Sequence, residues 1–539
     1  MRNERYAVRP CWNLLLVWVL CAFVADARAQ VGAAASAARG PAYTNPAVAG
    51  DYPDPSVIRV GRDYWATATS SEWGPEFPIL HSRDLVNWRV AGAVFRQRPA
   101  WSVGNYWAPE ISEYRGRFFV YYVGRKKDGP LCVAVASAAS PAGPYKDHGP
   151  LVCQDAGSID PMAVTDEGGR RYLVWKEDGN SRNLPTPIWA QRLSRDGTRL
   201  VGERKELIRN DAPWEAQLVE GPFIVRRGEW FYMFYSGNAC CTRDCNYALG
   251  VARSRALLGP WEKNLANPIL KGNDRWKCPG HGSVVSDATG RDFLLYHSYR
   301  AGDFVYVGRQ ALLDEIRWNA DGWPTINDGA GPSVRADSPL GVAERDAEYN
   351  FVDRFSSRQL APGWQWPQSN EPSVRLAGAP SPRLILAPAA GHANDMIGAV
   401  LARSTTAGDY TAMTLVDTSD LKAGALAGLS AYGDQENALG VAVGDGRIVL
   451  WRREKNEHKV VETKVAPNAA RLYLRMRARQ GHLFRFAFSR NGRDWTEVGG
   501  EMDGSYLPPW DRGVRVALTC GGAEGASARF QEVSITASR

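Results

Sequence analysis

The sequence lacks the features of three large functional classes. It has no basic run or basic helix, and its formal net charge of +7 is spread along the chain, which argues against nucleic acid as a partner. Its nine cysteines include no C-x-x-C pair, the spacing typical of zinc fingers. Beyond the N-terminus no apolar run is long enough to span a bilayer. We therefore expect no nucleic acid partner and no membrane span in the mature protein.

Helical periodicity is also scarce, whereas short aromatic and β-branched runs are frequent. Aromatic residues make up 11% of the 539 residues, a length that predicts two or more domains. Segments such as 117–122 and 230–235 are apolar on both faces, as strands packed between neighbouring sheets require. The pattern predicts an all-β protein.

One short aromatic strand recurs five times in the first three hundred residues. Each copy follows a turn rich in Gly, Arg or Asp, and successive copies lie 54 to 63 residues apart. Such repeats are typical of β-propeller blades, because one four-stranded sheet cannot bury both of its faces alone. Five copies predict a five-bladed propeller over residues 44–339. The copies are Tyr64-Trp65, Phe118-Phe119, Tyr172-Leu173, Trp230-Phe231 and Phe293-Leu294.

An ionisable residue precedes each aromatic strand by 8 to 12 residues. Equivalent positions of different blades converge on the propeller axis, so we expect these side chains to share one central pocket. A single Asp-Pro turn is more often structural, since Asp bonds its own backbone and Pro fixes φ. The recurrence of an ionisable residue at a similar position in every blade favours a functional site instead. The five residues are Asp54, Glu110, Asp160, Glu220 and His281.

The N-terminus has the pattern of a secretory signal peptide. Three arginines in the first nine residues precede an apolar stretch over 12–24, and Ala27-Arg28-Ala29 provides an A-x-A cleavage motif. A membrane anchor is the weaker alternative because the apolar stretch is short. We expect 1–29 to be the signal peptide, 30–43 to be a linker, and the mature protein to be periplasmic or secreted.

The cysteines that follow the signal peptide are odd in number. Export and the absence of C-x-x-C pairs favour disulfides over zinc. Cys132 and Cys153 are one candidate bridge, and the group within 238–245 is expected to form bridges in a blade loop. The full pairing stays open among Cys132, Cys153, Cys240, Cys241, Cys245, Cys278 and Cys520.

The pattern changes after residue 339. We interpret 340–350 as a linker and 351–539 as a second all-β unit, which opens with Phe351 and with Trp364-Gln-Trp366. Alternation with a period of two predicts a β-sandwich. We expect this domain to pack against the propeller and shape its pocket, with ligand binding as the alternative.

Several motifs, in order over residues 44–330, resemble glycoside hydrolase family 43. The second domain more loosely resembles the concanavalin-like jelly roll that follows the propeller in the β-xylosidase and arabinofuranosidase branches. The resemblance implies a five-bladed propeller that hydrolyses glycosidic bonds with inversion. The motifs are Asn45 to Ser56, Phe77 to Trp88, Trp107-Ala-Pro-Glu110, Ser158-Ile-Asp-Pro161, Glu220-Gly-Pro222 and Trp318 to Pro324.

Carried over by motif, the resemblance implies Asp54 as general base, Glu220 as general acid and Asp160 as the residue that orients the acid and tunes its pKa. Inversion itself requires one ionised carboxylate to activate water and one protonated carboxyl group to protonate the leaving oxygen, roughly 6.5 to 9.5 Å apart. Because a free Glu titrates at about 4.3, the acid needs a raised pKa. We expect Asp160 to raise the pKa of Glu220 by like-charge repulsion.

Further residues are candidates to bind substrate. Trp73 and Trp107 either stack on a sugar ring or pack within the blades. Arg309 resembles the family arginine that reaches the bound glycone, and Glu110 is either a substrate contact or a residue that fixes a turn. His281 resembles the family histidine at the propeller centre, where some members hold calcium. No cofactor is expected to be required, and a structural calcium ion near His281, or a water molecule in its place, is left open.

We expect an exported exo-glycosidase that removes terminal α-L-arabinofuranosyl or β-D-xylosyl units from plant cell-wall glycans such as arabinoxylan, arabinan or xylo-oligosaccharides. The second domain and the loop 72–77, which would close one end of the pocket, favour exo action. The alternatives are an endo-arabinanase or galactan-active member of the family, a non-catalytic glycan-binding propeller, and a phosphorylase with Arg309 and His281 at the phosphate. The insert 240–245 has no counterpart in the best-known members and leaves the sugar open.

Overall fold

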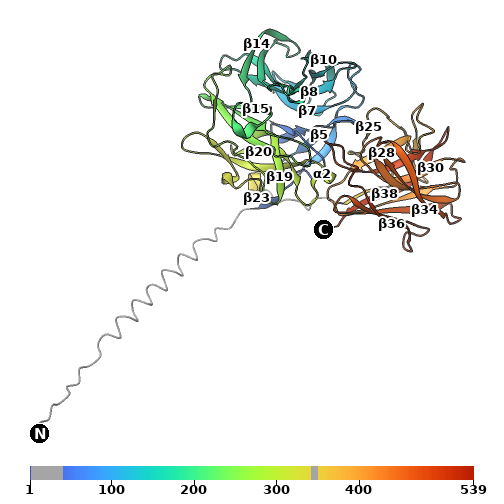
Figure 1. Cartoon of the computed structure of the whole chain (residues 1–539). Coiled ribbons are helices and arrows are strands. Elements are labelled where there is room, and N and C mark those ends of the chain that lie inside the picture. The colour runs from blue at the N-terminus through green and yellow to red at the C-terminus, as the bar shows by residue number, and fades with distance from the viewer. Residues whose placement is uncertain (2–40, 342–349, 539) are drawn as a thin grey trace.

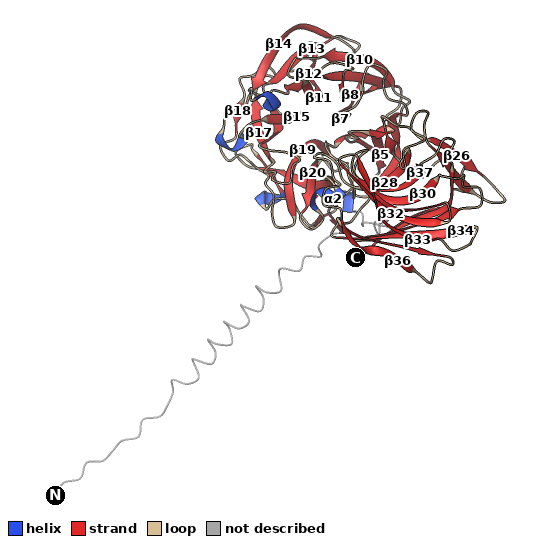
Figure 2. Cartoon of the chain, turned by 45° about the vertical axis from the view of Figure 1, so that its right-hand side comes forward, coloured by secondary structure: helices blue, strands red, loops and turns tan. Residues whose placement is uncertain are grey.

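The computed structural model describes residue 1 and residues 41–341 and 350–538. A β-propeller and a β-sandwich lie side by side (Figure 1), and the few helices of the described residues are single short turns in loops (Figure 2). No helix of the described residues has the length and apolar character needed to cross a membrane. Residues 2–29 of the predicted signal peptide, and most of the predicted linkers 30–43 and 340–350, lie outside the described residues.

Five four-stranded antiparallel sheets form the propeller, as the sequence repeat predicts. The first strand of each sheet contacts the first strands of its two neighbours, so these five strands ring the axis. The successive sheets are β2 (Ser56–Val60), β3 (Asp63–Thr67), β5 (Glu76–Ser82) and β6 (Arg89–Phe95); β7 (Trp107–Tyr114), β8 (Arg117–Arg125), β9 (Leu131–Ala138) and β10 (Lys146–Val152); β11 (Ser158–Thr165), β12 (Arg171–Glu177), β13 (Ile188–Leu193) and β14 (Leu200–Ile208); β15 (Val219–Arg227), β16 (Trp230–Gly237), β17 (Ala248–Ser254) and β18 (Glu262–Lys263); and β19 (Trp276–Ser286), β20 (Asp292–Arg300), β21 (Gln310–Trp318) and β22 (Pro324–Ile326).

The repeated aromatic pairs lie on the second strand of each sheet. Most of these side chains are buried in apolar clusters shared with adjacent sheets, which explains why each blade needs its neighbours. The loops between strands hold the short helices η1 (Asn180–Arg182), η2 (Pro213–Glu215), α2 (Phe304–Val307), η3 (Asn327–Gly329) and η4 (Pro339–Gly341).

The start of the described chain is tied to the last blade. Strand β1 (Ala42–Thr44) pairs with β23 (Arg335–Asp337). Tyr43 is fully buried and its hydroxyl donates to the carbonyl of Leu313 on β21. Ala42 and Tyr43 therefore form a strand, where the sequence predicted the end of a linker.

Two antiparallel sheets with a single apolar core between them form the second domain, as predicted. One contains β24 (Asn350–Asp353), β26 (Ser373–Ala377), β27 (Arg383–Ala387), β29 (Tyr410–Asp417), β34 (Arg471–Arg479), β35 (Leu483–Ser489), β36 (Thr496–Asp503) and β38 (Ala528–Ala537). The other contains β28 (Ala399–Ser404), β30 (Leu426–Tyr432), β31 (Ala438–Gly444), β32 (Arg447–Glu454), β33 (Glu457–Val465) and β37 (Arg515–Gly521).

A small sheet and a buried ion pair join the two domains. Strand β4 (Trp73–Gly74) of the first blade pairs with β25 (Trp366–Pro367) of the sandwich. Arg515 of β37 reaches Asp51 of the propeller at 3.1 Å, and both side chains are only 3% exposed. The Asp51 carboxylate also accepts the backbone N–H of Gly513. The joint is therefore polar at its centre, where both oxygens of the Asp51 carboxylate are hydrogen-bonded.

Replacing Arg515 with Met should destabilise the joint by about 3–5 kcal/mol, because the buried Asp51 carboxylate loses its cation. Urea unfolding followed by fluorescence measures the change in the first transition. Arg354→Met is the matched control, since Arg354 pairs with Glu532 at the surface with 71% of its side chain exposed; its loss should cost about 0–1 kcal/mol. Equal effects of the two substitutions would contradict this account of the joint.

Candidate active site

The innermost strands of all five blades share one backbone feature. In or just before each of them, one residue adopts a left-handed conformation, with φ between 41° and 57°. In four blades the pairing register also shifts at this point. Left-handed residues other than glycine are uncommon and concentrate at functional sites, because the surrounding structure must hold them. The five residues are Asp54, Ala108, Asp160, Gly221 and His281.

This feature corrects the predicted common slot in two blades. Asp54, Asp160 and His281 occupy it as predicted. In the fourth blade Gly221 occupies the left-handed position. Glu220 is the residue before it, so its side chain leaves the strand one position earlier than those of Asp54, Asp160 and His281 do in their blades. A side chain is unfavourable at Gly221, where a Cβ would lie 2.9 Å from the His281 ring.

In the second blade the left-handed slot holds Ala108, and Glu110 lies two residues further along β7. Glu110 is paired in register with Tyr121 and is 6% exposed. Burial raises the pKa of Glu110 to about 7, against the opposing effect of nearby Arg171. Glu110 therefore lies near Arg171 of the third blade, and the prediction that it occupies the same slot as Asp54, Asp160 and His281 is wrong.

Asp54 is buried among groups that favour its ionised form. Arg309 donates to its Oδ1 at 3.0 Å, and Thr69 donates to its Oδ2 at 2.7 Å. The Nδ1 atoms of His297 and His281 lie 3.1 and 3.5 Å from Oδ1. Burial alone would raise the pKa of Asp54, but the nearby positive charge, above all that of Arg309, outweighs it and holds this pKa well below its usual range. Asp54 is thus a permanent carboxylate near neutral pH.

Glu220 has a different set of partners. Lys176 donates to its Oε2 at 2.7 Å, and the Tyr247 hydroxyl donates to its Oε1 at 2.8 Å. Asp160 is held beside it, because the Gly221 backbone N–H, adjacent in sequence, donates to Asp160 Oδ2 at 2.9 Å. The two carboxyl groups thus share one buried environment next to a single ammonium group.

The electrostatic surroundings of this pair favour Asp160 over Glu220 as the group that carries its proton. Burial raises the pKa of Asp160 to about 7, and the charge of Glu220 adds to the rise while His281 and Lys176 oppose it. Burial would also raise the pKa of Glu220, but Lys176 overrides it and the pKa falls below its ordinary value. The net rise in the pKa of Glu220 that the general acid needs is therefore not found in this state, while a raising contribution from Asp160 stays a prediction. The pair holds one proton below about pH 7.

His281 lies between the two acidic centres. Its Nδ1 is 3.5 Å from Asp54 Oδ1 and 3.9 Å from Asp160 Oδ2, and its side chain is 16% exposed. The described residues contain no group of three or more His, Cys, Asp or Glu side chains suited to a metal ion. A hard cation such as calcium prefers six to eight oxygen ligands, so the structure gives no support for calcium at His281 and we derive no step through a metal.

Trp73 does not line the axis. It is 2% exposed, lies under the guanidinium of Arg515 at 4.6 Å, and meets Tyr432 of the sandwich edge to face. Glu72, in the same loop, accepts from the side chain of Gln368 in the sandwich. The prediction that Trp73 stacks on a sugar is therefore wrong, because the loop 72–77 docks the second domain instead.

Trp107 meets an aromatic residue of the sandwich. Its ring and that of Trp510 lie 5.7 Å apart at 87°, and Trp510 is 58% exposed. The next residue, Asp511, accepts from the Ser71 hydroxyl at 2.8 Å, and its carbonyl accepts from Arg309 at 3.4 Å. A loop of the second domain thus reaches the groups that surround Asp54. Whether Trp107 or Arg309 touches substrate stays a prediction.

The cysteine insert also reaches this region. Disulfides join Cys132 to Cys153, as predicted, and Cys240 to Cys241 and Cys245 to Cys278; Cys520 is a buried free thiol. The sulfur of Cys240 lies 3.8 Å from Nη1 of Arg309. Arg243 donates to the carbonyl of Ser505, at the start of the sandwich loop that carries Trp510. The insert therefore connects the fourth blade to that loop.

Sequence reasoning missed several residues of this cluster. Lys176 and His297 lie on the second strands of their blades, outside the repeated motif. The signal for Lys176 was its position directly after the apolar run 172–175, and its side chain is 1% exposed. The others are Thr69, Tyr247 and Trp510, for which the sequence carries no comparable signal.

Comparison with known proteins bears on this cluster. A family model described as glycosyl hydrolases family 43 matches residues 43–324, and one described as a beta xylosidase C-terminal concanavalin A-like domain matches residues 352–535. The chain is 28% identical over 500 residues to xylosidase/arabinosidase 43B of Humicola insolens, a match that covers 87% of this chain and 90% of that protein.

Two further similarities cover different extents of the chain. The extracellular exo-alpha-(1->5)-L-arabinofuranosidase ArbA of Cellvibrio japonicus is 28% identical over 319 residues, which covers 52% of this chain and 87% of that protein. The crystal structure of the GH43 protein BlXynB from Bacillus licheniformis matches 92% of this chain and 100% of its own, with a TM-score of 0.80 and 25% identity.

Proposed function

The chain belongs to glycoside hydrolase family 43 and is a glycoside hydrolase, and from this premise we propose that it is an inverting exo-enzyme that releases terminal α-L-arabinofuranosyl or β-D-xylosyl residues from plant cell-wall glycans. One observation carries the proposal. Asp54 is held ionised, while Asp160 and Glu220 together retain one proton to about pH 7. Inverting hydrolysis needs one carboxylate and one carboxylic acid at the same time.

Asp54 acts as the general base in this proposal. Arg309 and Thr69 fix both of its oxygens, so the carboxylate is oriented before a substrate arrives. The backbone N–H of Asp54 donates to His297 Nδ1, which leaves that ring neutral, in accord with a pKa that burial lowers to about 4. The carboxylate accepts a proton from the attacking water.

Glu220 and Asp160 act together as the general acid. Asp160 holds the proton of the pair in the free enzyme, passes it to Glu220 when substrate is bound, and Glu220 then delivers it to the leaving oxygen, which leaves both carboxyl groups ionised. Lys176 sets the balance between them, because its ammonium group stabilises ionised Glu220 at 2.7 Å. After the transfer, the same ammonium group stabilises the carboxylate that Glu220 has become. General acid catalysis of this kind contributes about 10²–10⁴-fold to the rate.

The second domain supports exo action in this proposal. Trp510 and the loop around it stand against Trp107 and reach Arg309, so the sandwich walls one side of the region around Asp54. An open groove along the propeller face would suit an endo-enzyme instead. The pentose sugars are chosen from the names of the relatives, which include a xylosidase/arabinosidase and an exo-acting arabinofuranosidase.

Export is part of the proposal and rests on the N-terminal sequence. A relative is named as extracellular, and the disulfides, such as Cys132–Cys153 and Cys245–Cys278, suit an oxidising compartment. Amino-terminal sequencing of the protein recovered outside the cytoplasm should begin at Gln30. A chain that stays in the cytoplasm with residues 1–29 attached would contradict export.

Hydrolysis of aryl α-L-arabinofuranoside and aryl β-D-xyloside tests the proposal. We expect release of one or both sugars with inversion, followed by NMR of the newly formed anomer, and losses of about 10²–10⁴-fold in Asp54→Asn and Glu220→Gln. Glu229→Gln is the control, since Glu229 belongs to the same blade as Glu220 but is 80% exposed.

Three results would overturn parts of this function. Retention of anomeric configuration would exclude Asp54 as the base for a direct water attack. Binding of glycans without turnover would favour the non-catalytic propeller. Cleavage inside arabinan chains with no release from aryl glycosides would favour an endo-enzyme.

A further inference from the structure

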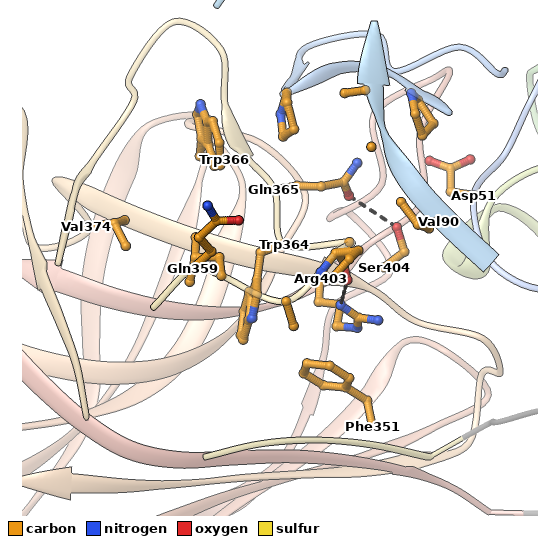
Figure 3. Close-up of a pocket in the computed structure, with 18 of the residues that line it drawn as sticks. Asp51, Val90, Phe351, Gln359, Trp364, Gln365, Trp366, Val374, Arg403 and Ser404 are labelled. Carbon is orange, nitrogen blue, oxygen red and sulfur yellow. Dashed lines mark hydrogen bonds between the residues drawn. The ribbon is translucent and has the colours of Figure 1, made fainter. Parts of the chain in front are cut away.

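A large hollow lies at the joint between the first blade and the sandwich (Figure 3). Its volume is about 740 Å³, within the roughly 300 to 1,000 Å³ of small-ligand pockets. Asp54, Asp160 and Glu220 are not among the residues that line it. Thr69, which donates to Asp54, does line the hollow, so the hollow adjoins the candidate active site without containing its three carboxyl groups.

A second, smaller hollow of about 280 Å³ adjoins the first. The two share Arg96, Trp366 and Glu371 as lining residues. They form one continuous depression that passes Trp366, which we call the joint groove. Two adjoining hollows suit an extended ligand with several ring units rather than a single compact one.

Trp366 is a fixed aromatic surface within the joint groove. It is held by the pairing of β25 with β4, and its Nε1 would lie only 2.8 Å from a Cβ at Gly74, so the ring packs directly on that backbone. The side chain is nevertheless partly exposed and borders both hollows. Rigid aromatic rings with one open side are suited to the apolar C–H face of a sugar ring, and they lose little conformational entropy on binding.

Glu76 provides an unused polar group in the wall of the smaller hollow. It is 2% exposed, and its Oε2 has no hydrogen-bond partner among the described residues. Buried polar atoms are almost always paired, so an unpaired one at the wall of a groove indicates a partner that comes from outside the chain. Burial also raises the pKa of Glu76 to about 7, which lets this group either donate to or accept from a hydroxyl.

Among the described residues that line the joint groove, the exposed arginines Arg96, Arg98 and Arg358 outnumber the exposed acid. Asp51 is neutralised by Arg515, which leaves Glu371 as the exposed acid of the larger hollow. Arg403 stacks on Phe351, with its guanidinium 3.6 Å from the ring centroid, and is held there by the carbonyl of Pro362 (Figure 3). The cations that line the joint groove are Arg96, Arg98, Arg358 and Arg403.

We propose that the joint groove is a second glycan-binding site, which takes a pentose oligosaccharide bearing a uronic acid group. Trp366 stacks on a sugar ring, Glu76 pairs with a sugar hydroxyl, and Arg96 binds the uronate. The exposed amide of Gln359 lies within the larger hollow as an additional hydrogen-bonding group (Figure 3). The choice of a pentose backbone rests on the proposed function, whereas the uronate follows from the charge of the groove.

Isothermal titration of the full-length Glu220→Gln variant tests this site. The probes are xylotetraose and xylotetraose carrying one glucuronic acid. We expect the acidic probe to occupy two sites, and Trp366→Ala in the same background to leave one. Arg96→Ala should weaken the second site by about tenfold for the acidic probe, the loss of one charge-assisted contact. Arg62→Ala, an exposed arginine on a hairpin of the same blade, is the control and should change neither site.

The outcomes separate this site from the active site. A single site for the acidic probe, or two sites that persist in both Trp366→Ala and Arg96→Ala, would overturn the proposal. Arg96→Ala keeps the test valid if Trp366→Ala fails to fold, because Arg96 is exposed. Equal affinity of the second site for both probes would overturn the uronate assignment. Hydrolysis of aryl pentosides by the wild type tests the proposed function independently, because those substrates are too short to span the groove.

Discussion

The left-handed residue of each inner strand is the constraint on which the site depends. In four blades the strand leaves its regular ladder at this residue, and in the first blade the residue lies just before β2; the feature turns Asp54, Asp160 and His281 toward the axis and places Glu220 one residue before Gly221. Such conformations persist only when the surrounding fold determines them. The neighbouring blades hold these residues in place, because each inner strand contacts the inner strands of both adjacent blades.

Electrostatics then gives chemically identical groups different protonation states. Burial acts in the same direction on every carboxyl of the cluster, so the difference between them comes from the cation that each one meets. Arg309 and its neighbours keep Asp54 ionised, whereas Lys176 stands against Glu220 and leaves the proton to Asp160. Lys176 comes from the second strand of the third blade and Arg309 from the residue just before β21, so the base and the acid each meet a cation from outside the inner strands.

The second domain contributes to the protein through its contacts with the propeller. The pairing of β4 with β25 and the Asp51–Arg515 ion pair hold it in place. Because it is held there, the loop with Trp510 stands beside Trp107, and the joint groove forms on another side of the same interface.

Much of this could be predicted from the sequence, and the failures have physical causes. The repeat of aromatic strands predicts five blades, and the motifs identify Asp54, Asp160 and Glu220. Both signals can be found in the sequence because local turns and apolar faces depend on residues that are close together in the chain. Trp73 was misplaced because its burial depends on a domain more than 290 residues away in sequence, where Gln368 also meets its loop.

Proton placement could not be predicted for a related reason. The pKa of Glu220 depends on Lys176, and nothing in the spacing of the two residues shows that their side chains meet at 2.7 Å. Glu110 was misassigned because a shift of two residues along a strand is invisible in a pattern that tolerates 8 to 12 residues of spacing.

The pH dependence of kcat/KM on an aryl pentoside tests the central claim most directly. The account predicts a rate that falls as pH rises through about 7, where the Asp160–Glu220 pair loses its proton. In Lys176→Met the fall should move to higher pH, because removing a cation disfavours ionisation of the pair. Lys263→Met, which removes a lysine that pairs with Glu215 in the fourth blade, should leave it in place. A fall that stays at the same pH in Lys176→Met, or a rate that rises through pH 7 in the wild type, would contradict the account.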